Sequence, residues 1–589
     1  MLYPFESSTR EVKPLDGLWK LFFDPEHTGL EKDFINTPPL NCEEIAVPGS
    51  INEQILERWK YNNMDWVWYF RSFFIPDFWK TKRIFLRFDA VSYSAKVYLN
   101  GRFLGTHEGG YTPFEFEIGN TCNLGALNHL AVLVDNPLSL VTIPQGKVNP
   151  SVGGVANWRP GNYPDVHYDF FPYMGIQRPV RIYATGASRL EKLFLTTEEL
   201  FQNSAVCKVQ IKTSGSAQKG ELCIPALNLN VSFEIKNEQA EFSFKAEKVV
   251  FWSHETPMLY DIEIRIFNQN GFSDLYRMPY GFRKIEIKGY DFLLNGKKIF
   301  FRGFGKHEDT AVAGKGLNLP YLVKDAKLMK WLGANSYRTS HYPYSEEAMF
   351  QADREGFLII DETAANTLSM LGVQNPTDRK IMAENHIKAI RELIERDYNH
   401  PCVMSWSLGN ECETKNAADA LYFQEMITYA KTLDHSRPMT FVIFGLADDE
   451  EAAHCFDWIC FNTYPSWYGD CGRFEEIETI LSKRIKKYRD KFQKPILISE
   501  FGADALPGLH SEYDLMWSEE YQVKMISEII RVSEQFPCIC GTHIWNFADF
   551  RVGQHTGRII NNWKGLFTRD RTPKMAAHFI KNKWNPEKS

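Results

Sequence analysis

From about residue 286 onward, short apolar runs alternate with longer stretches that have the periodicity of amphipathic helices. Such alternation is typical of parallel β-strands joined by helical crossovers. Eight candidate strands in about 300 residues match the size of one closed (β/α)8 TIM barrel. An open, doubly wound sheet is the alternative, but the chain has no Gly-rich phosphate-binding fingerprint to support it. The candidate strands are Ile299–Phe301, Ser336–Arg338, Leu358–Asp361, Val403–Trp406, Thr440–Ile443, Trp458–Phe461, Ile496–Ile498 and Thr542–Trp545.

The part of the chain before this alternation carries mainly strand signals. Arg83–Phe88 alternates with period two, which predicts a half-buried strand, and Asn100-Gly101 between apolar runs predicts a type I′ hairpin. We therefore expect a jelly-roll β-sandwich over residues 1–187. Short strands such as Leu259–Ile266 recur over residues 188–285, which predicts an immunoglobulin-like β-sandwich that acts as a spacer. The TIM barrel then occupies residues 286–589.

Two of the candidate barrel strands lead into a carboxylate, at Glu411 and at Glu500. A Glu placed directly after a buried strand is costly unless the strand emerges there into a polar cleft. Catalytic groups of β/α barrels lie at these strand ends, although a strand-end charge can also simply meet water. Two carboxylates on opposite walls suit glycoside hydrolysis, in which one protonates the leaving oxygen and the other attacks the sugar or activates water. The sequence does not give their separation, so retention and inversion are both open at this point.

Composition excludes several classes of function. The net charge is −7 and no basic patch occurs, which disfavours nucleic-acid binding. No run of 18 apolar residues is present, so we expect no membrane span. The N-terminus, Met1–Ser7, lacks the features of a signal peptide, and the eleven cysteines are scattered, so we expect a reduced, cytoplasmic protein. Neither Cys538/Cys540 nor the consecutive His307–Asp309 has the spacing of a metal site, so we expect no cofactor and no metal.

Four motifs resemble glycoside hydrolase family 2. They are Ser407–Glu411, Ile498–Gly502 and Arg338–Pro343, together with Val91–Gly101, which resembles the sugar-binding domain at the N-terminus of that family. The resemblance covers nearly the whole chain and is closest to the β-glucuronidases of bacterial type. It implies an exo-acting, retaining enzyme that hydrolyses β-D-glucuronides to glucuronic acid and an alcohol by double displacement. It also implies that Glu411 is the general acid/base and that Glu500 is the nucleophile.

The expected sugar specificity depends on Asn562-Trp563-Lys564. The resemblance implies that Asn562 and Lys564 hold the C6 carboxylate of the sugar and that Arg558 is a further contact on that side. The chemistry agrees, because an acidic sugar needs a cation and a donor and a neutral sugar does not. A solvated surface lysine is the alternative interpretation of Lys564.

The resemblance implies further sugar contacts, each of which has an ordinary structural alternative such as a capping Asp or a buried Tyr with a satisfied hydroxyl. In the expected roles, Asp169 holds sugar hydroxyls, Asn410 holds the 2-hydroxyl, Tyr464 hydrogen-bonds the nucleophile, and Tyr468 and Trp545 wall the pocket. His341 contacts the sugar or orients Glu411. The expected substrate-binding residues are Asp169, His341, Asn410, Asn462, Tyr464, Tyr468, Trp545, Arg558, Asn562 and Lys564.

One segment, Asn366–Pro376, is shorter than the loop that covers the aglycone in some bacterial members of the family. It predicts an open aglycone side that tolerates larger conjugates or oligosaccharide ends. We expect the substrate to be a small-molecule glucuronide or an oligosaccharide ending in glucuronic acid. Members of the family often form tetramers or dimers, so we expect a homo-oligomer. Two other functions stay open: hydrolysis of a β-galactoside, β-mannoside or galacturonide, and carbohydrate binding without turnover. The presence of both Glu motifs argues against the latter.

Overall fold

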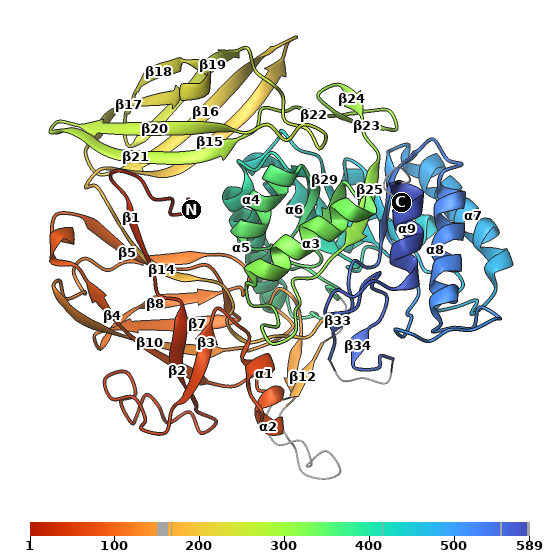
Figure 1. The fold of residues 1–589 in the computed structure, drawn as a ribbon, viewed down its shortest axis with the longest axis horizontal. Helices are drawn as coiled ribbons and strands as arrows, with labels where there is room; N and C mark the ends of the chain where they lie inside the picture. Colours follow the sequence, from red (N-terminus) through yellow and green to blue (C-terminus); the bar gives the residue numbers. More distant parts are fainter. Residues whose placement is uncertain (150–162, 167, 371, 416, 554–556, 586–589) are drawn as a thin grey trace.

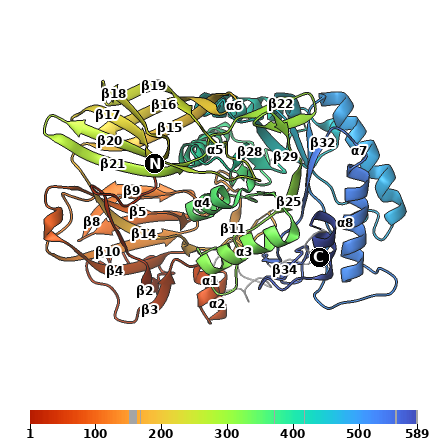
Figure 2. The ribbon, with the colours of Figure 1, turned by 45° about the horizontal axis from the view of Figure 1, so that its top comes forward.

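The computed structural model describes residues 1–149, 163–166, 168–370, 372–415, 417–553 and 557–585. Two β-sandwiches lie on one side of a closed barrel, as Figures 1 and 2 show. In Figure 1 the jelly-roll strands are red to orange, the immunoglobulin-like strands are yellow to light green, and the barrel is green to blue. The fold class expected from the sequence is confirmed. None of the helices in these ranges combines the length and the apolar character needed to cross a membrane.

The first sandwich packs a four-stranded antiparallel sheet against a six-stranded one. The hairpin at Asn100-Gly101 forms as expected, with φ values of 50° and 79°. The strand at Arg83–Phe88 differs from expectation, because it is buried on both faces. Its Arg87 side chain pairs with Asp89 and with Glu346 of the barrel, so a second domain covers the face that we expected to meet water. In sheet order the strands are β1 (Glu11–Pro14), β14 (Val180–Thr185), β5 (Arg83–Phe88) and β9 (Phe114–Glu117), then β3 (Glu43–Val47), β2 (Gly17–Phe23), β4 (Val67–Ile75), β10 (Ala126–Asp135), β7 (Ser94–Leu99) and β8 (Arg102–Glu108).

The second sandwich contains a three-stranded and a four-stranded antiparallel sheet around its own apolar core. It is tied to the barrel by polar contacts: the Trp252 indole donates to the Asp353 carbonyl at 2.8 Å, and Asn399 Nδ2 donates to the Leu193 carbonyl at 2.7 Å. These contacts suit a spacer that holds the other two domains in place. The residues at which each domain ends stay predictions. The strands are β15 (Arg189–Leu200), β16 (Ser204–Ser214) and β19 (Gln239–Glu247), then β18 (Leu229–Glu234), β17 (Ala217–Ile224), β20 (Tyr260–Asn268) and β21 (Gly271–Tyr280).

The barrel closes with eight strands, and every neighbouring pair is parallel. The expected runs overlap all eight strands, although the first strand begins only at Phe301. Ile299 instead lies before the strand and donates its N–H to the carbonyl of Phe292. Phe292 belongs to β23 (Asp291–Leu294), the middle strand of a small three-stranded sheet with β22 (Ile285–Lys288) and β24 (Lys297–Lys298). The strands are β25 (Phe301–Gly305), β26 (Ser336–Arg338), β27 (Leu358–Glu362), β28 (Val403–Asn410), β29 (Met439–Ile443), β30 (Ile459–Asn462), β31 (Ile496–Glu500) and β32 (Ile539–Ile544).

Amphipathic helices surround the barrel strands, as their burial patterns show. The described crossover between β29 and β30 is an exception, because it contains only the short 3-10 turns η4 (Ala447–Asp449) and η5 (Ala452–Cys455). The helices are α3 (Leu319–Leu332), α4 (Glu346–Glu355), α5 (Pro376–Asp397), α6 (Ala417–Leu433), α7 (Ile477–Phe492), α8 (Glu519–Ser533) and α9 (Met575–Trp584).

Candidate active site

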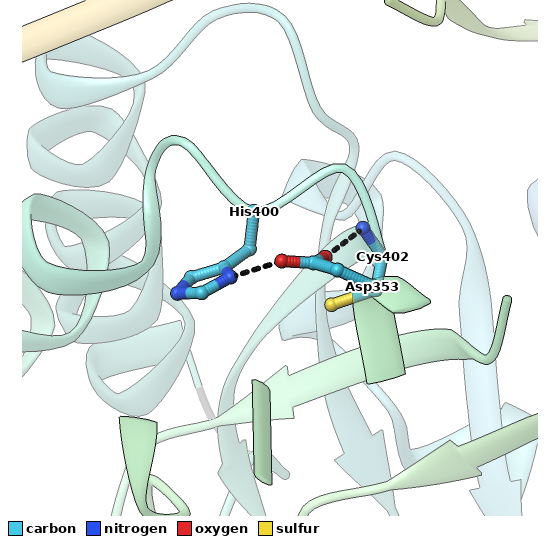
Figure 3. Close-up of side chains that lie close together, drawn as sticks. All are labelled: Asp353, His400 and Cys402. Atoms are coloured by element: carbon cyan, nitrogen blue, oxygen red, sulfur yellow. Dashed lines mark hydrogen bonds and ion pairs between the residues drawn. The ribbon is translucent and has the colours of Figure 1, made fainter. Parts of the chain in front are cut away.

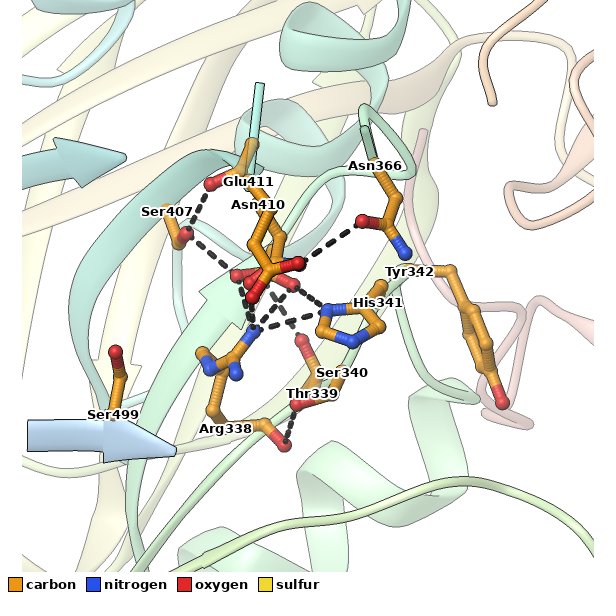
Figure 4. Close-up of polar contacts among 12 residues, drawn as sticks. Arg338, Thr339, Ser340, His341, Tyr342, Asn366, Ser407, Asn410, Glu411 and Ser499 are labelled. Atoms are coloured by element: carbon orange, nitrogen blue, oxygen red, sulfur yellow. Dashed lines mark hydrogen bonds and ion pairs between the residues drawn. The ribbon is translucent and has the colours of Figure 1, made fainter. Parts of the chain in front are cut away.

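The carboxyl ends of four barrel strands bring one arginine and three glutamates together. Arg338, the last residue of β26, is fully buried and lies between Glu362 of β27 and Glu500 of β31. Its Nη1 donates to both oxygens of Glu362 at 2.8 Å, and its Nη2 pairs with Glu500 Oε1. Burial opposes the charge of Glu362, but the Arg338 cation outweighs it and holds the pKa of that carboxyl below its usual value. Figure 4 shows Arg338 reaching toward Asn410, with His341 beside it.

Glu500 is almost completely buried, and both of its oxygens have donors. Tyr464 donates its hydroxyl to Oε2 at 2.7 Å, while Arg338 pairs with Oε1. His341 Nε2 lies 3.7 Å from the same Oε1, and its ring stacks on Trp545 with 5.1 Å between centroids. A carboxylate held by a cation and a hydroxyl is fixed in one orientation, which suits a group that attacks a sugar carbon.

Glu411 follows β28 and has a left-handed backbone, with φ 52°. Its Oε1 accepts a hydrogen bond from Asn462 Nδ2 at 2.7 Å, and its side chain is only partly exposed. Burial and the negative charge of Glu500 raise the pKa of Glu411 to about 7. The same Asn462 Nδ2 donates to Asn410 Oδ1, which also accepts from Arg338 Nη1, and Arg338 Nη2 pairs with Glu500. A chain of hydrogen bonds therefore joins the two carboxylates in one pocket. Glu411 can therefore hold a proton near neutral pH, as a general acid must.

Two amide side chains hold this pocket together. Asn410 Oδ1 accepts from Arg338 Nη1 at 3.3 Å and from Asn462 Nδ2 at 3.2 Å. Asn410 Nδ2 donates to Asn366 Oδ1 at 2.9 Å, and Asn462 Oδ1 accepts from the Ser499 hydroxyl at 2.9 Å. These bonds fix both amides, and they direct the Nδ2 group of Asn462 at the proposed acid/base.

Lys564 is fully buried, so the interpretation as a solvated surface lysine is wrong. Its ammonium pairs with Asp504 and lies over the rings of Trp467, Tyr468 and Tyr464, at 4.8, 5.1 and 5.8 Å from their centroids. Because the Tyr464 hydroxyl is bonded to Glu500, the ammonium lies beside the carboxylate pocket. A cation buried among aromatic rings suits recognition of a carboxylate.

Arg558 forms a second cationic contact next to Lys564. Its guanidinium donates to Asp169 at 2.8–3.2 Å and to the Tyr468 hydroxyl at 2.7 Å. Asn562 Nδ2 donates to Asp169 Oδ2 at 2.7 Å, so the jelly-roll aspartate reaches the barrel residues that we expected to hold the sugar. Asp169 and Tyr468 remain partly exposed, which leaves this side of the pocket accessible.

All of the expected site residues belong to this connected group of contacts. No role was predicted from the sequence for Arg338, Glu362, Asp504 or Trp467. The sequence offered one signal for Asp504, its position four residues after Glu500 on the loop that follows β31, but nothing in it indicated the pairing with Lys564.

A separate buried cluster contains Asp353, His400 and Cys402, whose potential ligand atoms lie within 4.8 Å of one another (Figure 3). Asp353 Oδ2 already bonds His400 Nδ1 at 2.5 Å, and Asp353 Oδ1 accepts the Cys402 N–H at 3.0 Å. Burial and the nearby Asp353 raise the pKa of the Cys402 thiol well above its usual value. Since metals bind the thiolate, this cluster fits a polar contact that ties α4 to the start of β28 better than a metal site.

Comparison with known proteins gives full-length matches. Three family descriptions fit in succession: "Glycosyl hydrolases family 2, sugar binding domain" over residues 12–186, "Glycosyl hydrolases family 2" over 188–283, and "Glycosyl hydrolases family 2, TIM barrel domain" over 285–588. The beta-glucuronidase of Paenibacillus borealis is 34% identical over 99% of this chain and 98% of its own length. The solved beta-D-glucuronidase of Dictyoglomus thermophilum is 38% identical, covers 99% of this chain and 98% of its own, and has a TM-score of 0.90. The Ruminococcus gnavus β-glucuronidase in complex with D-glucuronic acid is 33% identical, covers 99% of both chains and has a TM-score of 0.92.

Proposed function

The chain belongs to glycoside hydrolase family 2, and on that basis we propose that it is a retaining, exo-acting β-glucuronidase. It hydrolyses β-D-glucuronides to glucuronic acid and an alcohol. The observation that carries the proposal is a pocket in which Glu411 and Glu500 lie beside two cations, Lys564 and Arg558. The similar chains of known structure include one bound to D-glucuronic acid.

In the proposed mechanism, the Glu500 carboxylate attacks the anomeric carbon while the bond to the aglycone oxygen breaks. Glu411 gives its proton to that oxygen, and a glycosyl ester on Glu500 remains. Glu411, now ionised, then takes a proton from water as the water attacks the same carbon, and Glu500 leaves as a carboxylate. Arg338 and Tyr464 hold Glu500 in both steps, since both donate to it.

On the sugar side, Lys564, Asn562 and Arg558 bind the C6 carboxylate in this proposal. Asp169 and Asn410 bind hydroxyls, and Trp545 and Tyr468 form walls. The two cations form charge-assisted hydrogen bonds with the C6 carboxylate of a uronic acid. A neutral hexose has no anionic group at C6, so it cannot form them.

The experiment that tests the proposed function compares matched p-nitrophenyl glycosides and follows the first-formed anomer by proton NMR. We expect turnover of the β-glucuronide to exceed that of the β-galactoside, β-mannoside and β-galacturonide, with β-glucuronic acid formed before mutarotation. A first-formed α anomer would show inversion and refute the nucleophilic role of Glu500. Faster turnover of another sugar would refute the specificity, and binding without turnover would refute an enzyme.

The pKa of Glu411 sets an expected pH dependence. As a general acid Glu411 works only when protonated, so kcat/KM for an alkyl glucuronide should fall about tenfold per pH unit above a pKa of about 7. The measurement is a pH profile of kcat/KM between pH 5 and 9. In Glu411→Gln this alkaline limb should vanish for an aryl glucuronide with a good leaving group, since that leaving group needs no proton. If the alkaline fall in kcat/KM persists unchanged in the variant, another residue causes it.

The short segment at 366–376 leads to an expectation about the aglycone. Its apolar residues Leu368, Met370 and Val373 are buried, and the Ser369 N–H donates to Gln145 Oε1 of the jelly roll at 2.7 Å. This packing against the jelly roll supports the expected open aglycone side. We expect kcat/KM for an oligosaccharide ending in glucuronic acid to lie within about tenfold of that for a small aryl glucuronide, a range of about 1.4 kcal/mol. A far larger advantage for the small substrate would contradict an open aglycone side.

A further inference from the structure

Asp504 is a fully buried carboxylate with three donors from one segment of the barrel. Its Oδ2 pairs with the Lys564 ammonium and lies 3.4 Å from Arg558 Nη1. Its Oδ1 accepts the backbone N–H of Trp563 at 2.8 Å. One acidic side chain therefore joins both proposed uronate-binding cations to the loop that follows Glu500.

The charges of this group balance without substrate. Arg558 is paired mainly with Asp169, and Lys564 is paired with Asp504. A buried ammonium without such a partner would be strongly unfavourable, because desolvation of the charge would not be compensated. Asp504 thus allows a lysine to be charged and fully buried at this position.

Asp504 also fixes where the two cations lie. Among the described residues, Asp504 is the one hydrogen-bond partner of the Lys564 ammonium, while Trp467 and Tyr468 pack against it as rings. The ammonium has three donors, so donors remain for a ligand once Asp504 is bound. Since Arg558 Nη1 approaches the same Oδ2, that oxygen holds the two cations side by side.

We propose that Asp504 is a positioning residue for uronate recognition: it holds Lys564 and Arg558 at the spacing at which a substrate carboxylate binds both. The inference rests on the proposed function and deepens it. In the described part of the chain, Asp504 has no hydrogen bond or ion pair to Glu411 or Glu500. Its effect should therefore appear in binding of the uronic acid and not in cleavage of the glycosidic bond.

Asp504→Asn tests this assignment, because it removes the charge while keeping the size and the acceptor for the Trp563 N–H. We expect KM for an aryl glucuronide, and the inhibition constant of free glucuronic acid, to rise about 10- to 100-fold. We expect kcat to stay within about threefold of wild type. A residue that only stabilises the fold would not separate KM from kcat in this way.

Asp549→Asn is the matched control, since Asp549 is equally buried and pairs with the buried Lys574 at 2.8 Å. It should lower the melting temperature without raising the inhibition constant of glucuronic acid. Should Asp504→Asn fail to fold, Asp504→Glu keeps the charge but displaces it by one methylene, and its KM should still rise.

The inference is overturned if wild type hydrolyses glucuronides while the folded Asp504 variant has an unchanged KM, or loses kcat alone. Failure of wild type to hydrolyse any glucuronide would instead remove the proposed function, and the role of Asp504 with it. The two failures are therefore distinguished by the wild-type assay.

Discussion

Glu500→Gln is expected to lower kcat for an aryl glucuronide by about 10⁴-fold or more, because an amide cannot form the glycosyl ester. The variant should fold, since the Gln carbonyl can still accept the hydrogen bond of Tyr464 and the side chain keeps its volume. Steady-state turnover on p-nitrophenyl β-glucuronide measures the loss, and the melting temperature shows whether the fold is intact.

Glu500→Ala, which leaves room for a small anion, distinguishes a nucleophile from a group that merely supports the site. Azide added to a variant lacking the nucleophile should restore turnover of an activated glucuronide and give an α-glucuronyl azide. Azide added to Glu411→Gln should give the β product, because there Glu500 still forms the ester and azide attacks it from the opposite face. These opposite stereochemical outcomes follow from the two proposed roles.

Glu450→Gln is the control for loss of a buried glutamate. Burial raises the pKa of Glu450 to about 7, as it does for Glu411, but its carboxylate bonds Thr414 and backbone N–H groups outside the pocket. Its kcat should stay within about tenfold of wild type. Glu500→Gln with more than about a tenth of wild-type turnover would exclude Glu500 as the nucleophile.

The barrel could be predicted from sequence because strand and helix periodicities are local. The structure differs from these predictions where one element contacts another that is distant in the sequence. Ile299 lies before the first barrel strand, where its N–H bonds the Phe292 carbonyl of a neighbouring sheet. Arg87 lies on a strand that reads as half-buried, yet Glu346 of another domain covers it. Such contacts leave no periodic signal in the strand itself.

The candidate site residues likewise differ in how far local sequence patterns predict them. Glu411 and Glu500 can be recognised from the sequence because each comes after an apolar run that predicts a strand. The burial of Lys564 and its pairing with Asp504 join positions 60 residues apart, and no local pattern marks them. The pKa of Glu411 likewise depends on burial and on the charge of Glu500, which only the closed barrel brings near.

Among these residues, substitution of Lys564, which pairs with the distant Asp504, has the largest expected effect on sugar specificity. Lys564→Gln removes a charge-assisted hydrogen bond to the sugar carboxylate, worth about 1.5–3 kcal/mol. It also leaves the buried Asp504 charge without its partner, which lowers the free energy of unfolding by about 3–5 kcal/mol. We expect kcat/KM for the glucuronide to fall about 10²- to 10³-fold, while that for the matched neutral glucoside stays within about threefold.

A double variant separates these two contributions. Lys564→Gln with Asp504→Asn removes the unpaired charge, so the melting temperature should recover toward wild type. Glucuronide turnover should stay low, because the cation that binds the C6 carboxylate is still missing. If the melting temperature and glucuronide turnover both recovered, Lys564 would stabilise the fold and would not bind the sugar.

Lys574→Gln controls for removal of a buried ammonium as such. Lys574 is as buried as Lys564 and bonds Asp549 at 2.8 Å, but its remaining hydrogen bonds go to the carbonyls of Ala505 and Trp563. It should lower stability without changing the ratio of glucuronide to glucoside turnover. If Lys564→Gln lowers both activities equally, the lysine does not select the acidic sugar. A fall confined to the uronide requires that the ammonium contact the carboxylate, since the two substrates differ only at C6.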